Sequence, residues 1–528
     1  MKIFAYTILL LMSVSCKVQE VNTEFENLDN WHFKSFDKDS VAGISMDKTF
    51  EYLKNKKGRE VIIAVIDSDV DINHNDIKRL VWHNPDEIVN NDIDDDNNGY
   101  IDDIHGWNFT RNKKGERVMY TTNSQIEIIN YYDSKFKNKA LKEVGKDSIE
   151  FKIYQNALNT YKKDQEKIEL YKGYYEKMID WFPKAKKEMF TIFKKNDYSI
   201  AELDSVVTVF EKIKNDSLAD YAYLLYQYKK NNLAGTFEKG LEDTKQQKLK
   251  SNNLKYNDRL LLGDDVYDLK DKNYGSNIVN SNLDKLSHGT TVSGVIALLN
   301  KNRKTNIKIL FLPLFTKAGA EKDKDLALAI KYAVDNGAKV INFSSSKNFS
   351  LHNDWVNDAL KYAKKHGVIF VGSTTNDSRN YDEKPTFPNG IGNNKILENF
   401  IMVGASSKNI DSTLLPSFSS YGKKTIDVFA PGENIPTTKA FGGYLIDSGS
   451  SMASPMVCNT IALIYSYYPT IKSNEIKNIL HQSVDKYDVM IKLSTGEEIS
   501  FSDMSISGGI LNTYKAIKLA EKISKENK

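Results

Sequence analysis

Cysteine is nearly absent from this sequence, which has only Cys16 and Cys458 among its 528 residues. A disulfide framework is therefore excluded as the source of stability. Long apolar runs are also scarce: residues 3–12 form a run too short to span a bilayer, and no other segment reaches transmembrane length. Charge of one sign is not in excess, because the net charge is only +3. The composition thus gives no reason to expect nucleic acid as a partner.

What is present is ordinary for a soluble globular protein. Hydrophobic residues make up 40% of the chain and charged residues 27%. A length of 528 residues is enough for two or three domains.

The N-terminus has the pattern of a short export signal. Lys2 supplies a positive charge, residues 3–12 are apolar, and Ser-Val-Ser precedes Cys16. This pattern resembles a bacterial lipoprotein signal, so we predict that residues 1–16 are a signal peptide and that Cys16 is lipidated. The protein would then be an exported cell-envelope lipoprotein, anchored in a membrane on its periplasmic or cell-surface side. The alternative is an ordinary cleaved signal in which Cys16 is incidental.

Several continuous apolar runs predict strands that are buried on both faces, because they lack strict alternation. The first is Val61–Ile66, and the later runs lie at residues 307–314, 339–343, 368–371, 400–403 and 426–429. Helical patterns separate them, which predicts an α/β fold with a doubly wound, mostly parallel sheet sandwiched by helices. Ligand sites in such sheets lie beyond the carboxyl ends of strands, and Asp67 directly follows the first run.

A large insertion interrupts this pattern at residues 111–275. From Tyr154 to Phe182, apolar residues recur at steps of three, four or seven and predict one long helix. Ser199 and Glu202 have the spacing of a capping box at the start of a second helix. We therefore predict an inserted helical subdomain, whose apolar stripe is internal packing or, alternatively, a partner-binding face. The predicted organisation around it is a tether and extension at 17–57 and a catalytic domain at 58–110 and 276–528.

Three segments far apart in the sequence contain the residue types of an acyl-transfer triad. Asp67 lies in Ala-Val-Ile-Asp-Ser-Asp, His288 in Ser-His-Gly-Thr-Thr-Val-Ser-Gly, and Ser451 in Gly-Ser-Ser-Met-Ala-Ser-Pro. A serine hydroxyl needs a base to take its proton, and an imidazole oriented by a carboxylate is such a base. The chain order Asp, His, Ser is that of subtilisin. With these motifs the chain resembles the subtilisin family of serine peptidases, the subtilases.

The resemblance implies a role for further residues. Asn376 stands where the subtilase pattern has the side-chain donor of the oxyanion hole. The same pattern implies that a peptide or protein substrate binds along two segments, comprising Ser344, Ser345, Ser346, Gly372 and Ser373.

Five features depart from the family pattern. Asp69 and Thr375 each stand where a glycine is usual, and Thr291 replaces a second histidine. Ser450 replaces a threonine before the proposed nucleophile, and the three serines at residues 344–346 replace a Ser-aliphatic-Gly strand. None of these changes removes a reacting group, so we expect them to affect substrate range and rate more than the type of reaction.

An acidic segment at residues 90–103 predicts a structural calcium site. Its predicted ligands are Asp92, Asp94, Asp96, Asn98 and Asp103. The segment imitates a calcium loop without satisfying one register, because Gly99 and the closing carboxylate do not fit the same count. The alternative is a solvated acidic loop. The predicted chemistry itself needs no cofactor.

Together these features predict a serine endopeptidase that hydrolyses peptide bonds through an acyl-enzyme. The alternative is a catalytically weak or inactive protein with the subtilase fold, which binds or adheres through its helical insertion.

Overall fold

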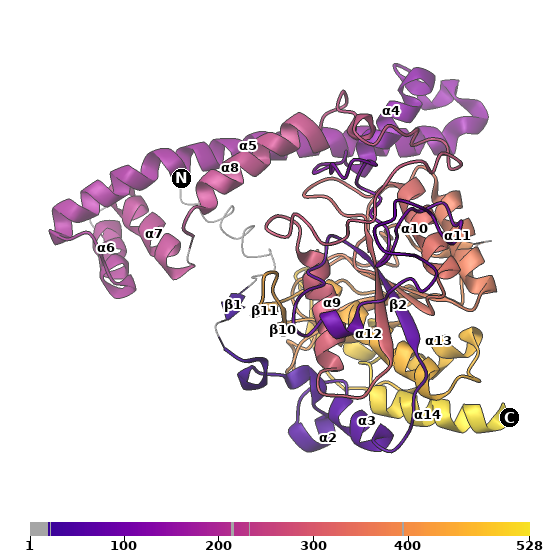
Figure 1. Cartoon of the computed structure of the whole chain (residues 1–528). Helices are drawn as coiled ribbons and strands as arrows, with labels where there is room; N and C mark the ends of the chain where they lie inside the picture. Colours follow the sequence, from indigo (N-terminus) through magenta and orange to yellow (C-terminus); the bar gives the residue numbers. More distant parts are fainter. Residues whose placement is uncertain (1–18, 22, 213–215, 232, 393–394, 528) are drawn as a thin grey trace. The chain divides into compact units, whose positions relative to one another are not determined.

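The computed structural model describes residues 19–21, 23–212, 216–231, 233–392 and 395–527, so the predicted signal peptide and Cys16 lie outside the described residues. The chain divides into two compact units (Figure 1). The sheet unit comprises the described residues up to Met119 and from Asp258 onward, and the helical unit is Tyr120–Asn257.

The helical unit is narrower than the predicted insertion of residues 111–275. Residues 111–119 and 258–275, at the two ends of the predicted insertion, belong to the sheet unit. Buried ion pairs join them to it. Arg117 forms an ion pair with Asp69, and Arg259 forms one with Asp325 at 2.8 Å.

Six strands form the central sheet, in the order β3-β2-β4-β5-β8-β9, and every neighbouring pair is parallel. Their bounds are β2 Val61–Asp67, β3 Ile307–Pro313, β4 Val340–Phe343, β5 Ile369–Ser373, β8 Phe400–Ser406 and β9 Val428–Pro431. This confirms the predicted α/β fold with a doubly wound parallel sheet.

Helices cover both faces of this sheet, and β2 shows why its sequence lacks alternation. Val61, Ile63 and Val65 face one core, whereas Ala64 and Ile66 face the other. The first core is shared with α3 Met46–Leu53, α9 His288–Leu299, α12 Ser450–Tyr467, α13 Ser473–Gln482 and α14 Thr513–Glu526. The second core is shared with α10 Asp323–Asp335 and α11 Asn353–Lys365. Because helices exclude water from both faces of the sheet, the residues of β2 that point to either face are apolar.

The segment before β2 packs on the sheet unit. Trp31, Met46 and Phe50 are buried in the first core. Strand β1, Gln19–Val21, pairs antiparallel with β11, Tyr444–Asp447. The remaining short elements are α2 Phe36–Asp39, β6 Ile391–Gly392, β7 Lys395–Ile396, β10 Ile435–Thr438, β12 Met490–Lys492 and β13 Glu498–Ser500.

The helical unit is built on one 46-residue helix, α5 Ser148–Phe193, as the apolar stripe predicts. Its other helices are α4 Ser124–Phe136, α6 Ile200–Lys212, α7 Asp216–Lys230 and α8 Thr236–Gln246. The predicted capping box before α6 is confirmed, because Ser199 N donates to Glu202 and Glu202 N donates to Ser199 Oγ at 3.1 Å. No helix in the described part of the chain is both long and apolar enough to cross a bilayer.

Candidate active site

Asp67 is the last residue of β2 and is completely buried. Its Oδ1 atom accepts a hydrogen bond from the backbone N–H of Ser68 at 2.7 Å. Its backbone carbonyl accepts hydrogen bonds from Leu314 and Phe315, which follow the neighbouring strand β3. The carboxylate is therefore held at the carboxyl edge of the sheet, where ligand sites occur in this class of fold.

His288 is the first residue of α9, and its ring contacts this carboxylate. The Nδ1 atom lies 2.8 Å from Asp67 Oδ1 and 3.0 Å from Oδ2. Burial lowers the pKa of His288, but the charge and hydrogen bond of Asp67 and the charge of Asp447 outweigh burial and raise the pKa above 6.5. An Nδ1–H that donates to a carboxylate leaves Nε2 free to accept a proton.

The approach of α9 to β2 requires a glycine directly after the histidine. A Cβ atom at Gly289 would lie only 2.4 Å from the carbonyl oxygen of Ser68. The backbone N–H of Gly289 donates to Ser68 Oγ at 2.8 Å. Any side chain here would push His288 away from Asp67.

Ser451 lies in the first turn of α12, which shares the first core with α9. Its Oγ atom donates to the carbonyl of Ser344 at 3.3 Å. Among the hydrogen bonds of the described residues, none joins this hydroxyl to His288. Ser344 in turn donates to the carbonyl of Ser451 at 3.3 Å, so β4 and α12 are linked at this point.

Asn376 is held beside the start of α12. Its Oδ1 atom accepts hydrogen bonds from the backbone N–H of Ser450 at 3.0 Å and from the Ser450 hydroxyl at 3.1 Å. Because a backbone N–H can only donate, the atom that faces it must be the amide oxygen. The Nδ2 group of Asn376 is therefore the part that remains able to donate.

The residues predicted to bind substrate lie in three different settings. Gly372 and Ser373 are buried inside β5, where they pair with β8. Ser345 and Ser346 are half-buried beyond the end of β4, and neither forms a backbone hydrogen bond within the described part of the chain. Ser344 is buried against α12. Of these residues, only Ser345 and Ser346 thus offer a partly exposed backbone with free hydrogen-bonding groups.

Thr375 fits its position without backbone strain, because it is not among the residues with a positive φ angle. Its Oγ1 atom donates to Asp377 at 2.6 Å. Asp377 also pairs with Arg379 at 2.6 Å, and Arg379 donates to Asn348 at 2.8 Å. The segment that follows Asn376 is therefore cross-linked to the segment that follows β4.

Asp69 has a set of partners that sequence reasoning did not predict. The side chain is fully buried and forms an ion pair with Arg117. Arg111 lies 3.9 Å away, and Asn108 Nδ2 donates to Asp69 Oδ1 at 3.0 Å. Burial raises the pKa of Asp69 to about 6 against the pull of both guanidinium groups, and burial lowers the pKa of Arg117 to about 10. A carboxylate in place of the usual glycine was the one visible signal of this cluster.

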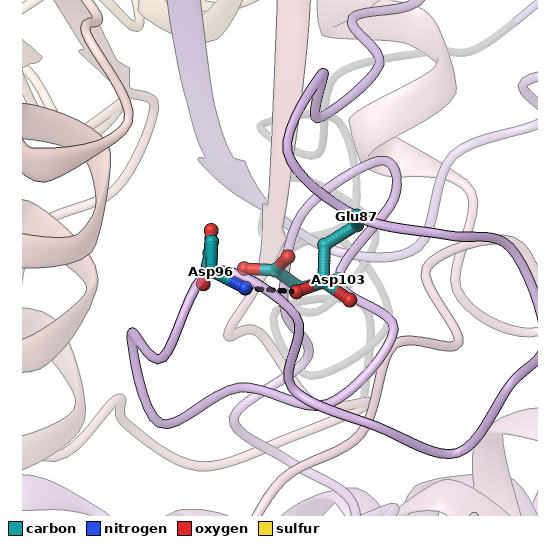
Figure 2. A group of neighbouring side chains, drawn as sticks. All are labelled: Glu87, Asp96 and Asp103. Atoms are coloured by element: carbon teal, nitrogen blue, oxygen red, sulfur yellow. Dashed lines mark hydrogen bonds between the residues drawn. The ribbon is translucent and has the colours of Figure 1, made fainter.

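The five predicted calcium ligands do not all converge. Asp94 accepts hydrogen bonds from the N–H groups of Asn98 and Gly99 at 3.0 and 2.8 Å and so closes a turn. Asp92 is exposed. Asn98 Nδ2 donates to Asp96 at 2.9 Å and to Asp103 at 3.0 Å, so these three predicted ligands lie together. The carboxylates of Asp96 and Asp103 form a group with that of Glu87, which the sequence pattern had not indicated (Figure 2).

The fold and this edge define a class: an α/β protein in which a buried aspartate pairs with a half-buried histidine at the carboxyl edge of a parallel sheet. The family model of the subtilases matches residues 58–497, which is most of the chain. The chain belongs to the subtilase family.

Curated relatives include two bacterial proteases. The chain is 29% identical over 288 residues to the cell wall-associated protease of Bacillus subtilis (strain 168), which covers 49% of this chain and 30% of that protein. It is 31% identical over 258 residues to the thermophilic serine proteinase of Bacillus sp. (strain AK1), covering 48% of this chain and 55% of the relative. The chain thus spans about half or less of the length of these relatives.

Among solved structures, the nisin leader peptidase NisP from Lactococcus lactis is similar. The match has 21% identity and a TM-score of 0.33, and it covers 44% of this chain and 72% of that chain.

Proposed function

We propose that this chain is an exported, lipid-tethered serine endopeptidase that uses Asp67, His288 and Ser451. The observation that carries this proposal is the contact of 2.8 Å between His288 Nδ1 and the buried carboxylate of Asp67. A buried carboxylate fixes the ring tautomer and stabilises the imidazolium that forms during catalysis. The motif around Ser451 supplies the nucleophile.

The reaction takes two steps. The Ser451 hydroxyl leaves the Ser344 carbonyl and gives its proton to His288 Nε2 while Oγ attacks the peptide carbonyl carbon. The imidazolium then gives that proton to the leaving amine, the C–N bond breaks, and an acyl-enzyme remains. Water, deprotonated by His288, attacks the ester and releases the acid and the free serine.

The negative charge on the tetrahedral intermediate needs donors that are already in place. Asn376 Nδ2 is one candidate, because Ser450 holds the other end of the amide. The backbone N–H of Ser451, at the N-terminal end of α12, is the second. Both donors are held by the same start of α12, so they are positioned relative to Ser451.

The proposed substrate is an extended peptide. It would add a strand beside Ser345 and Ser346, whose backbone groups are free of hydrogen bonds within the described residues. A main-chain ladder of this kind recognises peptides of many sequences, and pockets beside it would set the preference.

The proposed location follows from the N-terminal pattern. Lys2, the apolar residues 3–12 and the small residues before Cys16 support lipidation of Cys16 and retention at a membrane of the cell envelope. A lipid chain adds membrane affinity without a transmembrane helix.

One experiment tests the parts of this proposal together. Cells that express the full chain are fractionated, and each fraction is treated with a fluorophosphonate probe, which labels activated serines. We expect a labelled band in the membrane fraction of the wild type. Ser451→Ala should abolish labelling, and Cys16→Ser should move the labelled protein to the soluble fraction.

Asn376→Asp separates the oxyanion role from a packing role. The variant keeps an oxygen to accept from Ser450 but loses the N–H donor. Loss of this kind of donor costs roughly 100- to 1,000-fold in turnover in subtilisin itself, and we expect labelling to slow in the same direction. A folded wild type that is not labelled, while a control subtilase is, would refute the peptidase proposal.

A further inference from the structure

Four consecutive charged residues at the start of α10 are all buried. Lys322, Asp323, Lys324 and Asp325 are each at most 3% exposed. Charges that are buried to this extent are stable only when each one has a partner. The four pairs are Lys322–Asp258 at 3.3 Å, Asp323–Lys347 at 2.8 Å, Lys324–Asp264 at 2.5 Å and Asp325–Arg259 at 2.8 Å. These pairs fix the start of α10 to two other segments of the sheet unit.

The pair of Asp323 differs from the other three in where its partner lies. Lys347 directly follows Ser345 and Ser346, beside which the proposed substrate pairs, whereas the other partners lie at residues 258–264. The Lys347 ammonium binds Asp323 Oδ1 at 2.8 Å and donates to the carbonyl of Glu321 at 2.6 Å. The residue that follows the free segment is thus held by the start of α10.

Asp323 also binds the residues that follow Lys347. Its carboxylate accepts hydrogen bonds from Ser350 Oγ at 2.9 Å and from the backbone N–H of His352 at 2.8 Å. Burial raises the pKa of Asp323, but the charge and hydrogen bond of Lys347 and these two hydrogen bonds outweigh burial and lower the pKa. One ionised carboxylate therefore fixes residues 347–352.

The other end of the free segment is held by α12. Asn342 Nδ2 donates to Ser344 Oγ at 2.9 Å, and this oxygen lies 3.0 Å from Ser454 Oγ. Because α12 packs in the first core and α10 in the second, the two ends are fixed from opposite faces of the sheet. Between them, Ser345 and Ser346 form no backbone hydrogen bond within the described part of the chain.

The backbone of Lys347 marks where the free segment ends. Its N–H donates to the carbonyl of Phe387 at 2.9 Å, and its own carbonyl accepts from the N–H of Phe387 at 2.8 Å. Both backbone groups are therefore occupied and cannot pair with a peptide at the same time. Lys347 thus acts on the free segment by fixing its end, not by contact with the substrate.

We propose that Asp323 and Lys347 are positioning residues that hold the backbone of Ser345 and Ser346 ready to pair with an extended peptide. This inference rests on the proposed function. Pairing requires N–H and C=O groups at a fixed spacing and direction. A segment that already has this geometry loses less conformational entropy when a peptide binds. The ion pair therefore increases the affinity for extended peptides without contact with the reacting atoms.

The test compares Lys347→Met with Lys324→Met in the full chain. Lys324 is a matched control, because it also binds one carboxylate and one backbone carbonyl, those of Asp264 and Asp265. Each variant leaves a buried carboxylate without its ammonium, so both should melt at a lower temperature than the wild type. Only Lys347→Met releases the end of the free segment. All rates are measured at a temperature at which both variants are still folded.

Two readouts separate positioning from catalysis. Fluorescein-labelled casein is an unfolded protein that binds as an extended chain, whereas a fluorophosphonate probe needs only an activated Ser451. Lys347→Met should raise KM for casein roughly 10- to 100-fold, since a misplacement of about 1 Å can cost this much. Its labelling rate and kcat should stay within about 3-fold of the wild type, because ground-state binding is what is lost. Lys324→Met should leave KM within about 2-fold.

Two results would overturn the proposal: an unchanged KM in Lys347→Met, or an equal rise of KM in both variants, which would indicate a general loss of stability. If Lys347→Met does not fold, Asp323→Asn replaces it. That variant keeps an oxygen for the N–H of His352 but removes the charge that Lys347 binds, and the same rise in KM is expected.

Failure of the proposed function would give a different result. A folded wild type that neither labels nor cleaves would refute the peptidase, and the positioning role is then measured by binding alone. The anisotropy of fluorescein-labelled casein is followed as Ser451→Ala protein is added, with and without Lys347→Met. We expect the added substitution to weaken binding at least about 10-fold. Equal binding by the two proteins would refute the positioning role.

Discussion

The imidazole of His288 is influenced by two carboxylates that act in different ways. Asp67 contacts the ring directly at 2.8 Å. Asp447, the last residue of β11, acts on His288 through its charge. Burial raises the pKa of Asp447, and the charge of His288 opposes that shift. The proton affinity of the proposed base is thus set partly by a residue four positions before the proposed nucleophile.

Asp447→Asn should shift the acidic limb of the pH–activity profile to lower pH. A general base works only when it is neutral, so activity is lost as the pH falls through the pKa of His288. Because the charge of Asp447 raises that pKa, its removal lowers the pKa and preserves activity at lower pH. The measurement is kcat/KM against pH, with Asp358→Asn on the exposed side of α11 as control. An unchanged limb, or one that moves to higher pH, would contradict this assignment.

Residues 106–117, between the acidic loop and the helical unit, contact β3 and the residue that lies two positions after Asp67. At Gly106 a Cβ atom would lie 1.9 Å from the carbonyl oxygen of Phe311, so this segment lies directly against β3. Farther along it, Asn108 and Arg117 bind the carboxylate of Asp69. The position of the residues around Asp67 therefore depends on an element some forty residues later in the chain.

Arg117→Met should destabilise the sheet unit strongly. It leaves the buried carboxylate of Asp69 without its closest positive partner, and breaking a buried ion pair in this way costs about 3–5 kcal/mol. The measurement is unfolding in urea, followed by tryptophan fluorescence, in the Ser451→Ala background. Arg303→Met is the matched control, because the Arg303 side chain is 41% exposed and its pair with Asp47 contributes little.

The pair can also be removed as a whole. Asp69→Gly together with Arg117→Met restores the family's usual glycine and eliminates both charges, so we expect part of the lost stability to return. If the double variant were less stable than Arg117→Met alone, the buried pair would not be the source of the effect.

At the scale of the whole molecule, the chain enters and leaves the helical unit at neighbouring points. The Tyr256 hydroxyl donates to the carbonyl of Tyr120 at 3.2 Å, and Asn123 N donates to the carbonyl of Ser251 at 2.8 Å. A unit whose ends lie together can be inserted into a loop without disturbing the fold around it.

Replacing residues 120–257 with a short Gly-Ser linker should leave a folded sheet unit. We expect the rate of fluorophosphonate labelling at Ser451 to stay within a few-fold of the full chain, because Asp67, His288 and Asn376 all belong to the sheet unit. The linker variant of Ser451→Ala provides the unlabelled control. Loss of both labelling and cooperative unfolding would show instead that the sheet unit depends on the insertion.

The sequence alone was sufficient for features that depend on local pattern or on reactive side chains. The apolar runs predicted β2 and its parallel neighbours, and the stripe from Tyr154 to Phe182 predicted α5. The motifs around Asp67, His288 and Ser451 predicted the family, because acyl transfer restricts both the residue types and their immediate neighbours.

Only the tertiary structure decided which distant side chains meet. It joined Glu87 to Asp96 and Asp103, gave Asp69 its partner Arg117, and ended the helical unit at Asn257 rather than at residue 275. Periodicity describes which face of an element is apolar, but it carries no information about which polar groups lie opposite each other after folding. Those pairings depend on burial and charge balance across the whole unit, so they appear only once the chain is folded.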